Sequence, residues 1–324
     1  MTVLQHDLYG GIQAELDASA AIFRDELRSD LPFVNELCEY VERYHGKRVR
    51  PAVLLLAGQA AGRLTPAHAV LAAVVEMVHI ATLVHDDVLD DADTRRHLPT
   101  VCRLSGNEAA VLLGDVLFSH AYHLCSGLES QFAARQIGRT AVALCEGELL
   151  QVSNRGRFDL SEATYLEIIL RKTASLIATS CLLGAHYAGA DEGTVRRLAT
   201  FGESLGIAFQ IRDDLLDITG DAAEVGKTLG RDVEKGKLTL PLIHHLRAVD
   251  ARERAATEAL LSDTGDDRDA RIVERLRETD SIAFAHDRVR VHVGTAIAQL
   301  DALPPSPARD TLRVMADFVA SRTF

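Results

Sequence analysis

Apolar positions recur at helical spacing along almost the whole chain, and the alternation typical of strands is hard to find. The periodicity predicts helices over residues 11–29, 32–44, 67–91, 108–128, 131–152, 161–188, 194–219, 238–249, 270–301 and 307–321. Polar segments separate some of them: a basic turn at 46–51, a hinge at 93–107, a loop at 220–236 and a charged loop at 262–269. None of these segments has the composition of a flexible interdomain linker. The pattern therefore predicts a single all-α domain over residues 1–324.

The predicted helix at 67–91 stands out because apolar side chains surround most of its circumference. They include Val70, Leu71, Val74, Val75, Val78 and Leu83. A helix that is apolar all round belongs inside a large helical assembly. The abundance of Ala, Leu, Glu and Arg also favours helix. We expect a helical bundle built around a buried central layer.

Charge and composition narrow the function classes. The formal net charge of -12 argues against a nucleic-acid partner and against docking on anionic lipid. The five cysteines lack CxxC spacing, which argues against a zinc site or a disulfide framework and favours a reducing compartment. The N-terminus lacks a signal-peptide pattern, and no window reaches the roughly 18 uninterrupted apolar residues of a membrane span. We expect a cytoplasmic protein without a transmembrane segment.

Two aspartate clusters each follow an apolar helical run: DDVLD at 86–90 and DDLLD at 213–217. Residues four apart share a helical face, so Asp86 and Asp90 project together. Negative charge is disfavoured at a helix C-terminus, and crowded carboxylates repel one another. One cluster could be a solvated acidic face, but two copies at buried helix ends favour cation binding. Oxygen ligands of this kind select Mg²⁺, which is commonly completed by substrate phosphates.

Basic residues accompany the clusters in a protein that is acidic overall. They are Lys47 and Arg50 in the turn Gly46-Lys47-Arg48-Val49-Arg50-Pro51, Arg95 and Arg96 after the first cluster, Lys172 in a predicted helix, and Lys227 and Lys237 after the second cluster. Arginine suits phosphate oxygens bidentately, and lysine supplies a point charge. Carboxylate clusters with interspersed cations indicate a receptor for a polyanion such as a diphosphate.

These motifs together resemble those of the trans-polyprenyl diphosphate synthases. The run from His79 to Arg96 is similar to that family's first aspartate-rich motif, and the turn at 46–51 is similar to its GKxxRP motif. Phe209 to Asp217 resembles the second aspartate-rich motif, and Gly226 to Pro241 resembles the loop and helix start that follow it. The order and approximate spacing hold from residue 46 to 242, so the resemblance covers most of the chain.

The resemblance implies a fold, a reaction and a set of site residues. The fold would be a large helical bundle of the isoprenoid synthase type with a buried central cavity, assembled as a homodimer. Asp86 and Asp90 would bind two Mg²⁺ ions and Asp213 a third, supported by Asp87, Asp214 and Asp217. Arg95, Lys172, Lys227 and Lys237 would contact an allylic diphosphate, with Thr173 and Gln210 facing the reacting carbons. Isopentenyl diphosphate would be held without metal by Lys47, Arg50, His79 and Arg96.

In the implied reaction, departure of diphosphate leaves an allylic cation, which the alkene of isopentenyl diphosphate attacks head-to-tail. The new cation then loses a proton to the released diphosphate. Stabilising the departing anion electrostatically and excluding water are what such a site must do. For His79 the alternative is a hydrogen-bonded core histidine, and His85 is interpreted as structural. His97 stands where the family usually has Gly, which puts the conformation of this loop in question.

Small side chains beneath the first cluster favour a long-chain product. In the family that the motifs resemble, product length is set by the side chains before the first cluster on the same helix, where large aromatics would form a floor that stops growth. Here Thr82 and Ala81 lie one turn before Asp86, and both are small. The deeper positions are Val78, Met77 and Val74, and the facing helix offers Phe118 and Tyr122, either of which could form a lower floor. We expect a product of about C30 to C50, because the side-chain volume at this level leaves room for a long chain. The alternative is a short-chain farnesyl or geranylgeranyl diphosphate synthase.

Two further interpretations remain. A class I terpene cyclase shares the first cluster, but it usually replaces the second DDxxD with an Asn/Asp–Ser/Thr–Glu triad and lacks a site for isopentenyl diphosphate. A non-catalytic partner subunit of a heteromeric synthase typically loses an aspartate cluster or the basic turn. This chain keeps DDLLD and GKRVRP, which favour chain elongation.

Overall fold

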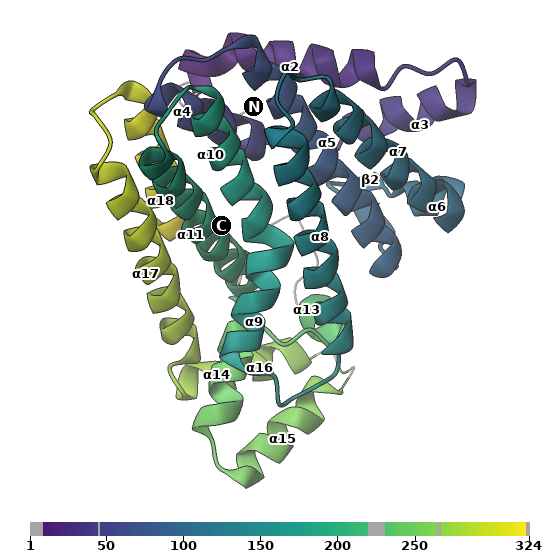
Figure 1. The fold of residues 1–324 in the computed structure, drawn as a ribbon. Coiled ribbons are helices and arrows are strands. Elements are labelled where there is room, and N and C mark those ends of the chain that lie inside the picture. Colours follow the sequence, from purple (N-terminus) through teal and green to yellow (C-terminus); the bar gives the residue numbers. More distant parts are fainter. Residues whose placement is uncertain (1–8, 45, 220–230, 264, 266, 322–324) are drawn as a thin grey trace. The chain divides into compact units, whose positions relative to one another are not determined.

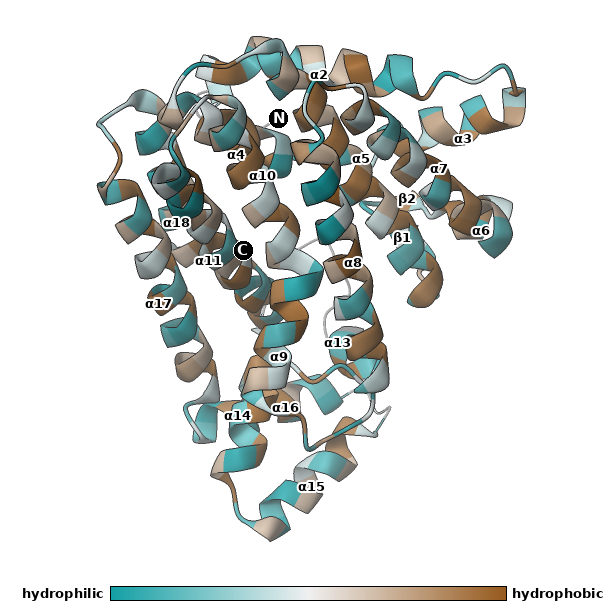
Figure 2. Cartoon of the chain, viewed as in Figure 1, coloured by the Kyte–Doolittle hydropathy of each residue, from teal (hydrophilic) through white to brown (hydrophobic). Residues whose placement is uncertain are grey.

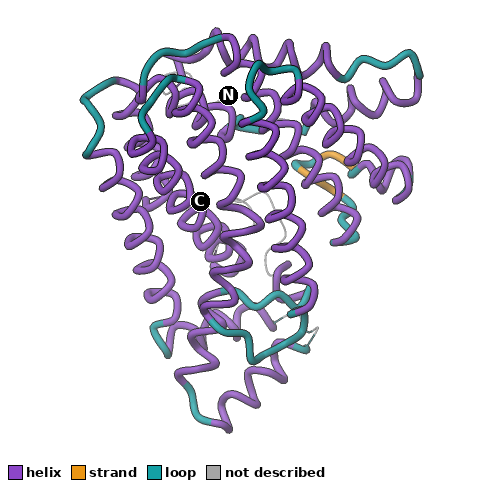
Figure 3. The backbone as a smooth tube through the Cα atoms, in the orientation of Figure 1, coloured by secondary structure: helices purple, strands orange, loops and turns teal. Residues whose placement is uncertain are grey.

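The computed structural model describes residues 9–44, 46–219, 231–263, 265 and 267–321. Helices make up most of this part of the chain (Figures 1 and 3). The strands within it are β1 (Thr94–Arg95) and β2 (Leu98–Pro99), which pair as a short antiparallel hairpin (Figure 3). The predicted all-α class is confirmed.

The helices follow in chain order. From the N-terminus they are η1 (Gly10–Ile12), α2 (Gln13–Glu26), α3 (Pro32–Glu42), α4 (Val49–Ala61), α5 (Pro66–Leu89), α6 (Val101–Ser105), α7 (Asn107–Ser126) and α8 (Phe132–Ser153). They continue with α9 (Glu162–Ile169), the π-helical turn η2 (Leu170–Ala174), α10 (Ser175–Tyr187) and α11 (Glu192–Thr219). The remainder are α13 (Arg231–Glu234), α14 (Leu240–Ala248), α15 (Ala251–Leu261), α16 (Arg268–Glu278), α17 (Ser281–Asp301) and α18 (Pro307–Ser321).

Several predicted elements need correction. The helices α4 and α15 were not predicted, and the hinge at 93–107 contains the β1–β2 hairpin and α6. The predicted helix at 270–301 is two helices, because Asp280 adopts a left-handed φ of 53° that L-residues avoid within a helix. Part of the loop predicted at 220–236 is the helix α13, and residues 220–230 lie outside the described residues.

The chain groups into two compact units. Unit 1 comprises Met1–Val142, Leu176–Gly202 and Ala302–Leu312, and unit 2 comprises Ala143–Ser175, Glu203–Asp301 and Arg313–Phe324. The first aspartate cluster and the basic turn therefore belong to unit 1. The second cluster belongs to unit 2, together with Lys172 and Lys237.

The helix α5 is the core of unit 1. It packs against α2, α4 and α7, and its apolar character is evident along its length (Figure 2). His68, in the first turn of α5, accepts a hydrogen bond at Nδ1 from the Thr65 N–H (2.9 Å), and its Nε2 lies 3.0 Å from the Gly184 carbonyl oxygen of α10. With Nδ1 accepting, Nε2 carries the proton and donates to Gly184. Burial lowers the pKa of this histidine, so the neutral ring joins the two helices.

Two stretches are long and apolar enough to cross a membrane by length and composition: α5 and the run from Glu162 to Tyr187. Most of each lies buried inside the protein. Their composition is that expected of core helices, as the all-round apolar pattern of α5 predicted.

A close approach between α4 and α10 depends on Gly184. A Cβ at this position would lie 2.1 Å from the Leu54 carbonyl oxygen and 3.0 Å from the Gly58 N. Both obstacles are backbone atoms and cannot move aside as a flexible side chain would. By contrast, a Cβ at Gly294, on the exposed face of α17, would meet no atom within 4 Å.

We therefore predict opposite effects of the same substitution at these two glycines. Gly184→Ala should lower the free energy of unfolding by about 1–3 kcal/mol, because it overpacks a backbone contact. Gly294→Ala should raise it by about 0.5–1 kcal/mol, because alanine loses less entropy in a helix. Urea denaturation followed by circular dichroism measures both. Equal effects at the two sites would contradict the role assigned to Gly184.

Candidate active site

The first aspartate cluster forms the C-terminal end of α5. The Asp90 N–H donates to the Asp86 carbonyl oxygen (2.9 Å), so these two residues sit one turn apart as predicted. Asp87 is almost completely buried and receives the Arg95 guanidinium, with Nε–Oδ1 at 2.7 Å and Nη2–Oδ1 at 2.6 Å. Burial alone would lower the pKa of Arg95, but the hydrogen bond and charge of Asp87 raise it. Arg95 thus neutralises Asp87, while Asp86 and Asp90 are half-buried.

The β1–β2 hairpin turns through Arg96 and His97, whose φ angles are 52° and 65°. The pairing of Arg95 with Leu98 leaves these two residues as the whole loop. A two-residue turn with positive φ at both positions is the type I′ class, which normally contains Asn or Gly. His97 therefore occupies the position that favours glycine, and it adopts the conformation that glycine would adopt. The loop therefore keeps a conformation that suits glycine even though His97 stands there, and Arg96 occupies the other position of the same turn.

The basic turn lies next to Arg96. The Arg96 Nη1 donates to the Tyr44 carbonyl oxygen, and a Cβ at Gly46 would lie 2.6–2.7 Å from the guanidinium. Glycine at 46 is therefore needed for the guanidinium to lie against the turn. Unit 1 brings two of the segments predicted to hold isopentenyl diphosphate together: the turn that carries Lys47 and Arg50, and the hairpin that carries Arg96.

Two histidines of α5 differ in their surroundings. His79, predicted to contact substrate, is half-buried. His85, interpreted as structural, lies with Nε2 3.0 Å from the Val111 carbonyl oxygen of α7 and against Gly114 of the same helix. The fully buried, doubly hydrogen-bonded histidine of this helix is His68.

In unit 2, a chain of hydrogen bonds leads to Asp214 of the second aspartate cluster. The Thr173 hydroxyl donates to Gln210 Oε1 (2.9 Å), and Gln210 Nε2 donates to Asp214 Oδ1 (2.8 Å). The buried Tyr165 hydroxyl donates to Asp214 Oδ2 (2.7 Å). Each carboxylate oxygen of Asp214 is therefore fixed by one side-chain donor: Oδ1 by Gln210 of α11 and Oδ2 by Tyr165 of α9.

Asp217, at the end of the same cluster, is tied to the segment that follows it. Its Oδ2 accepts a hydrogen bond from the Asp232 N–H (3.1 Å) of α13. The backbone then turns through Gly236, whose φ is 66° and whose carbonyl oxygen accepts from the Gly156 N–H (2.9 Å). A Cβ on Gly236 would lie 3.0 Å from Gly156 N, so glycine permits this approach and places Lys237.

Burial raises the pKa of Asp214 well above its usual range, and the neighbouring charges of Asp232 and Asp213 raise it further. The hydrogen bonds from Tyr165 and Gln210 act in the opposite direction. Burial also raises the pKa of the Tyr165 hydroxyl, which therefore keeps its proton as a donor. Because burial and neighbouring negative charges outweigh the two hydrogen bonds, an added positive charge would stabilise the ionised form of Asp214.

Lys172 and Thr173 lie on the π-helical turn η2, which interrupts the single helix predicted at 161–188. Turns of this type often occur at functional sites. Gly147 of α8 permits the turn to pack closely, because a Cβ there would lie 2.7 Å from the Lys172 N. The Lys172 Nζ donates to Gln151 Oε1 (2.9 Å) and forms an ion pair with Glu148.

These residues line one cavity of about 120 Å³ in unit 2. Its walls include the predicted site residues Lys172, Thr173, Gln210, Asp214 and Lys237, together with Gln151, Asn154, Arg155, Tyr165 and Asp232, which were not predicted. The polar groups come from α8 and the residues just after it, from α9, η2 and α11, and from α13 and the segment that follows it. A partly apolar cavity with convergent amide, hydroxyl, carboxylate and ammonium groups is a typical ligand site.

The structure places the predicted residues in two groups. Lys47, Arg50, His79, Asp86, Asp87, Asp90, Arg95 and Arg96 belong to unit 1, and Lys172, Thr173, Gln210, Asp213, Asp214, Asp217 and Lys237 belong to unit 2. Lys227 lies outside the described residues. Tyr165 was missed, although a tyrosine in a helix predicted to be largely apolar is a signal, because a buried hydroxyl usually finds a partner.

Known proteins resemble this chain over nearly its whole length. The polyprenyl synthetase family model matches residues 31–278. The chain belongs to this family. It is 36% identical to the heptaprenyl diphosphate synthase component 2 of Geobacillus stearothermophilus, over 98% of each chain.

Two solved structures of the family are also similar. A decaprenyl diphosphate synthase from Rhodobacter capsulatus has a TM-score of 0.94 and 33% identity, over 99% of each chain. A polyprenyl synthase from Caulobacter crescentus complexed with calcium and isoprenyl diphosphate has a TM-score of 0.92 and 33% identity, over 98% of each chain. The family predicted from the motifs is confirmed, and with it the class of the enzyme, a prenyltransferase.

The hydrogen bond from Tyr165 to Asp214 yields a test. Tyr165→Phe should raise the pKa of Asp214 further, because the bond from Tyr165 lowers it. The carboxylate then ionises at higher pH, so the acidic limb of the pH–activity profile should move upward. The Mg²⁺ concentration for half-maximal activity should rise as well. Steady-state assays across pH and Mg²⁺ concentration measure both effects.

The matched control is Tyr187→Phe, which removes a buried hydroxyl at the end of α10 in unit 1. It should leave the acidic limb and the Mg²⁺ requirement unchanged. An unshifted profile in Tyr165→Phe, in protein shown to be folded, would remove Tyr165 from the support of this cluster.

Proposed function

We infer that this enzyme condenses isopentenyl diphosphate with an allylic diphosphate, head-to-tail, to give an all-trans polyprenyl diphosphate. The observation that carries the proposal is the unit 2 cavity, where Lys172, Lys237, Thr173 and Gln210 converge beside a buried aspartate. Ammonium groups beside a carboxylate cluster suit a metal–diphosphate complex. The amide and hydroxyl suit the uncharged carbons next to it.

Mg²⁺ fits the donors that the chain presents. The half-buried Asp86, Asp90 and Asp213 offer hard oxygen ligands, and burial together with the neighbouring charges of Asp232 and Asp213 raises the pKa of Asp214, so an added cation would stabilise its ionised form. We propose that Asp86 and Asp90 hold two ions and Asp213 a third, with Asp87, Asp214 and Asp217 fixing these ligands. When bound, the ions neutralise the diphosphate that departs. The Caulobacter relative was solved with calcium and an isoprenyl diphosphate, which supports a divalent cation at such a site.

The residues of the chain have distinct proposed roles. Lys172, Lys227 and Lys237 stabilise the negative charge that develops on the leaving diphosphate, and Arg95 assists at the first cluster. The fixed dipoles of Thr173 and Gln210 face the allylic cation. Lys47, Arg50, His79 and Arg96 hold isopentenyl diphosphate without a metal, so that its alkene is oriented for attack. Preorganised charges of this kind stabilise a transition state without reorganisation during the reaction.

We propose a long-chain product. Below the first cluster, Ala81 is fully buried and Thr82 half-buried, and neither side chain is large enough to form a floor. Of the two candidate floors on α7, Tyr122 is 53% exposed, whereas Phe118 lies beside His85 with ring centroids 6.1 Å apart. Phe118 is therefore the better candidate for the lower limit. The hepta- and decaprenyl names of two relatives support a product of this class.

A second candidate is that the chain is one component of a heteromeric synthase. The Geobacillus stearothermophilus relative is named as component 2 of a heptaprenyl diphosphate synthase, which favours this alternative. The two aspartate clusters and the basic turn, all present in this chain, argue against a non-catalytic role.

We propose that the enzyme is a homodimer in the cytoplasm. The exposed apolar side chains of Val111, Leu112 and Val142 on α7 and α8 support a protein interface on these helices.

With Mg²⁺, the purified chain alone should convert farnesyl and isopentenyl diphosphates to products of about C30 to C50. The small side chains of Ala81 and Thr82 leave room for a chain of this length. Chromatography of the dephosphorylated products gives the chain length. Light scattering coupled to size exclusion gives the oligomeric state, for which we expect a dimer. A product that stops at C15 or C20 would establish the short-chain alternative, and a folded but inactive chain would favour the heteromeric one.

Thr82→Phe should shorten the product, because the added ring occupies space one turn before Asp86. The expected result is a shift of the product distribution toward shorter chains, with consumption of the allylic primer retained. Val291→Phe, on the exposed face of α17, adds a similar ring elsewhere and should leave the distribution unchanged. An unchanged distribution in Thr82→Phe would mean that the growing chain does not pass this level of α5.

A further inference from the structure

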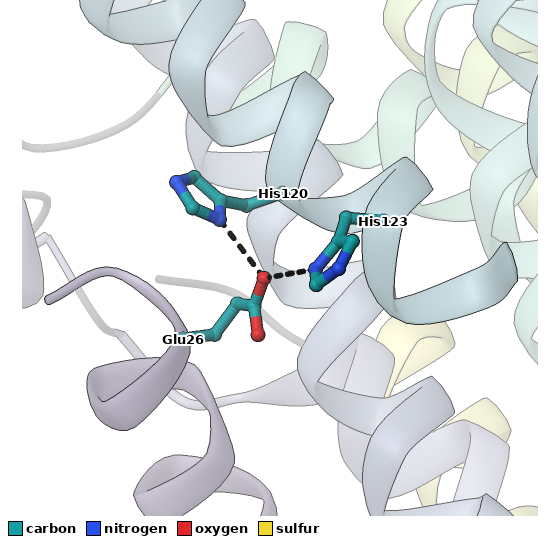
Figure 4. Close-up of side chains that lie close together, drawn as sticks. All are labelled: Glu26, His120 and His123. Atoms are coloured by element: carbon teal, nitrogen blue, oxygen red, sulfur yellow. Dashed lines mark hydrogen bonds and ion pairs between the residues drawn. The ribbon is translucent and has the colours of Figure 1, made fainter. Parts of the chain in front are cut away.

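Three metal-ligating side chains converge in unit 1 outside the aspartate clusters. Glu26 is the last residue of α2, and His120 and His123 lie three residues apart on α7 (Figure 4). The Nδ1 atoms of His120 and His123 are 2.9 Å and 2.7 Å from the same Glu26 Oε1. One ligand atom from each residue lies within 4.8 Å of the others.

The helical geometry places both imidazoles on one side of α7. Residues three apart are neighbours on a helix surface, so the two rings approach Glu26 together. The Glu26 side chain is only 16% exposed and that of His120 is 35% exposed, while His123 is 76% exposed. The carboxylate is therefore held within the protein, and the outermost ligand is free to adjust.

The charge balance favours a cation at this point. Burial alone would raise the pKa of Glu26, but the hydrogen bonds from His120 and His123 lower it, so the carboxylate is ionised. Glu26 also ends α2, where the helix dipole disfavours negative charge. A bound cation beside the Glu26 carboxylate would offset both its burial and the unfavourable helix dipole.

The donor set indicates which cation. Two imidazole nitrogens and one carboxylate oxygen suit zinc and the neighbouring late transition metals, whereas Mg²⁺ prefers oxygen alone. Three protein ligands with a water in the fourth position is a known zinc arrangement. Ligands at about 2.0–2.1 Å around a tetrahedral ion lie about 3.4 Å apart, so the atoms must separate by roughly half an ångström. Rotation of the exposed His123 can supply most of that movement.

We propose that Glu26, His120 and His123 form a binding site for one zinc-class divalent ion. On binding, each neutral imidazole moves its proton from Nδ1 to Nε2 through solvent, and Nδ1 coordinates the ion in place of its hydrogen bond. The ion ties the end of α2 to α7. Both of these helices contact α5, so the tie fixes the layer that covers the helix bearing the first aspartate cluster.

The experiment uses full-length, tag-free protein in excess Mg²⁺, so that Mg²⁺ saturates the aspartate clusters. Titration with zinc chloride, followed by calorimetry and thermal unfolding, should show one additional zinc equivalent and a Tm increase of several degrees. The site should weaken in acid, because protons compete with the metal ion for its ligand atoms. Cu²⁺ bound in place of zinc should show nitrogen hyperfine coupling in its electron paramagnetic resonance spectrum. Oxygen-only aspartate clusters cannot produce that coupling.

Three variants decide the assignment. His123→Gln and Glu26→Gln should each weaken the additional zinc equivalent by about tenfold or more and abolish the Tm increase, because each removes a ligand. His292→Gln, a half-buried histidine of α17, should retain both. His123 is mostly exposed, so its variant should unfold at the wild-type Tm without metal. Identical zinc binding in wild type and His123→Gln, or a Cu²⁺ spectrum without nitrogen coupling, would reduce the cluster to a hydrogen-bonded contact between α2 and α7.

Discussion

The two aspartate clusters of this enzyme place buried carboxylates next to other carboxylates, and the structure around them must stabilise the negative charge that results. A buried carboxyl group gives up its proton only if nearby positive charge or hydrogen-bond donors stabilise the anion. The chain meets this requirement differently at its two clusters. Asp87 is neutralised within the protein by Arg95, whereas the described partners of Asp214 are two neutral donors, Tyr165 and Gln210. Asp87 therefore has a countercharge within the protein, whereas Asp214 is held by uncharged donors and would be stabilised further by a bound cation.

The surrounding architecture follows from this requirement. The apolar helices α5 and α11 supply the low-dielectric setting that makes the aspartates responsive to cations. Small residues then permit backbones or charged groups to approach: Gly46 for the Arg96 guanidinium, Gly147 for the π-helical turn and Gly236 for the segment that carries Lys237. Each basic residue in this set is thus positioned by a nearby glycine rather than by a long flexible loop. Rigid placement of charge is what electrostatic catalysis requires.

Much of this organisation could be predicted from the sequence, because it rests on helical periodicity and on motifs at fixed spacing. The end of α5 and the pairing of Asp86 with Asp90 follow directly from residues four apart on a helix. The helix α4 was missed because the basic turn at 46–51 was interpreted as a break in the helical pattern, whereas α4 begins within it at Val49 and accepts Pro51 in its first turn. The hairpin after the first cluster was missed because Arg96 and His97 are not typical residues for a type I′ turn. Side-chain partners such as Tyr165 with Asp214 depend on tertiary contacts between distant segments, which no local pattern encodes.

The π-helical turn at Leu170–Ala174 joins α9 and α10 in one continuous helical run and shifts the helical phase between them. Each α-helical residue advances by about 100°, so one extra residue in a turn rotates everything after it by that amount. The side chains of α9 and those of α10 therefore follow different phases, and Lys172 and Thr173 lie where the phases change. Deleting a single residue here would restore an uninterrupted α-helix and improve its local hydrogen bonding. It would also remove the wide turn on which Lys172 and Thr173 lie, so the directions of these two side chains depend on a local departure from α-helical geometry.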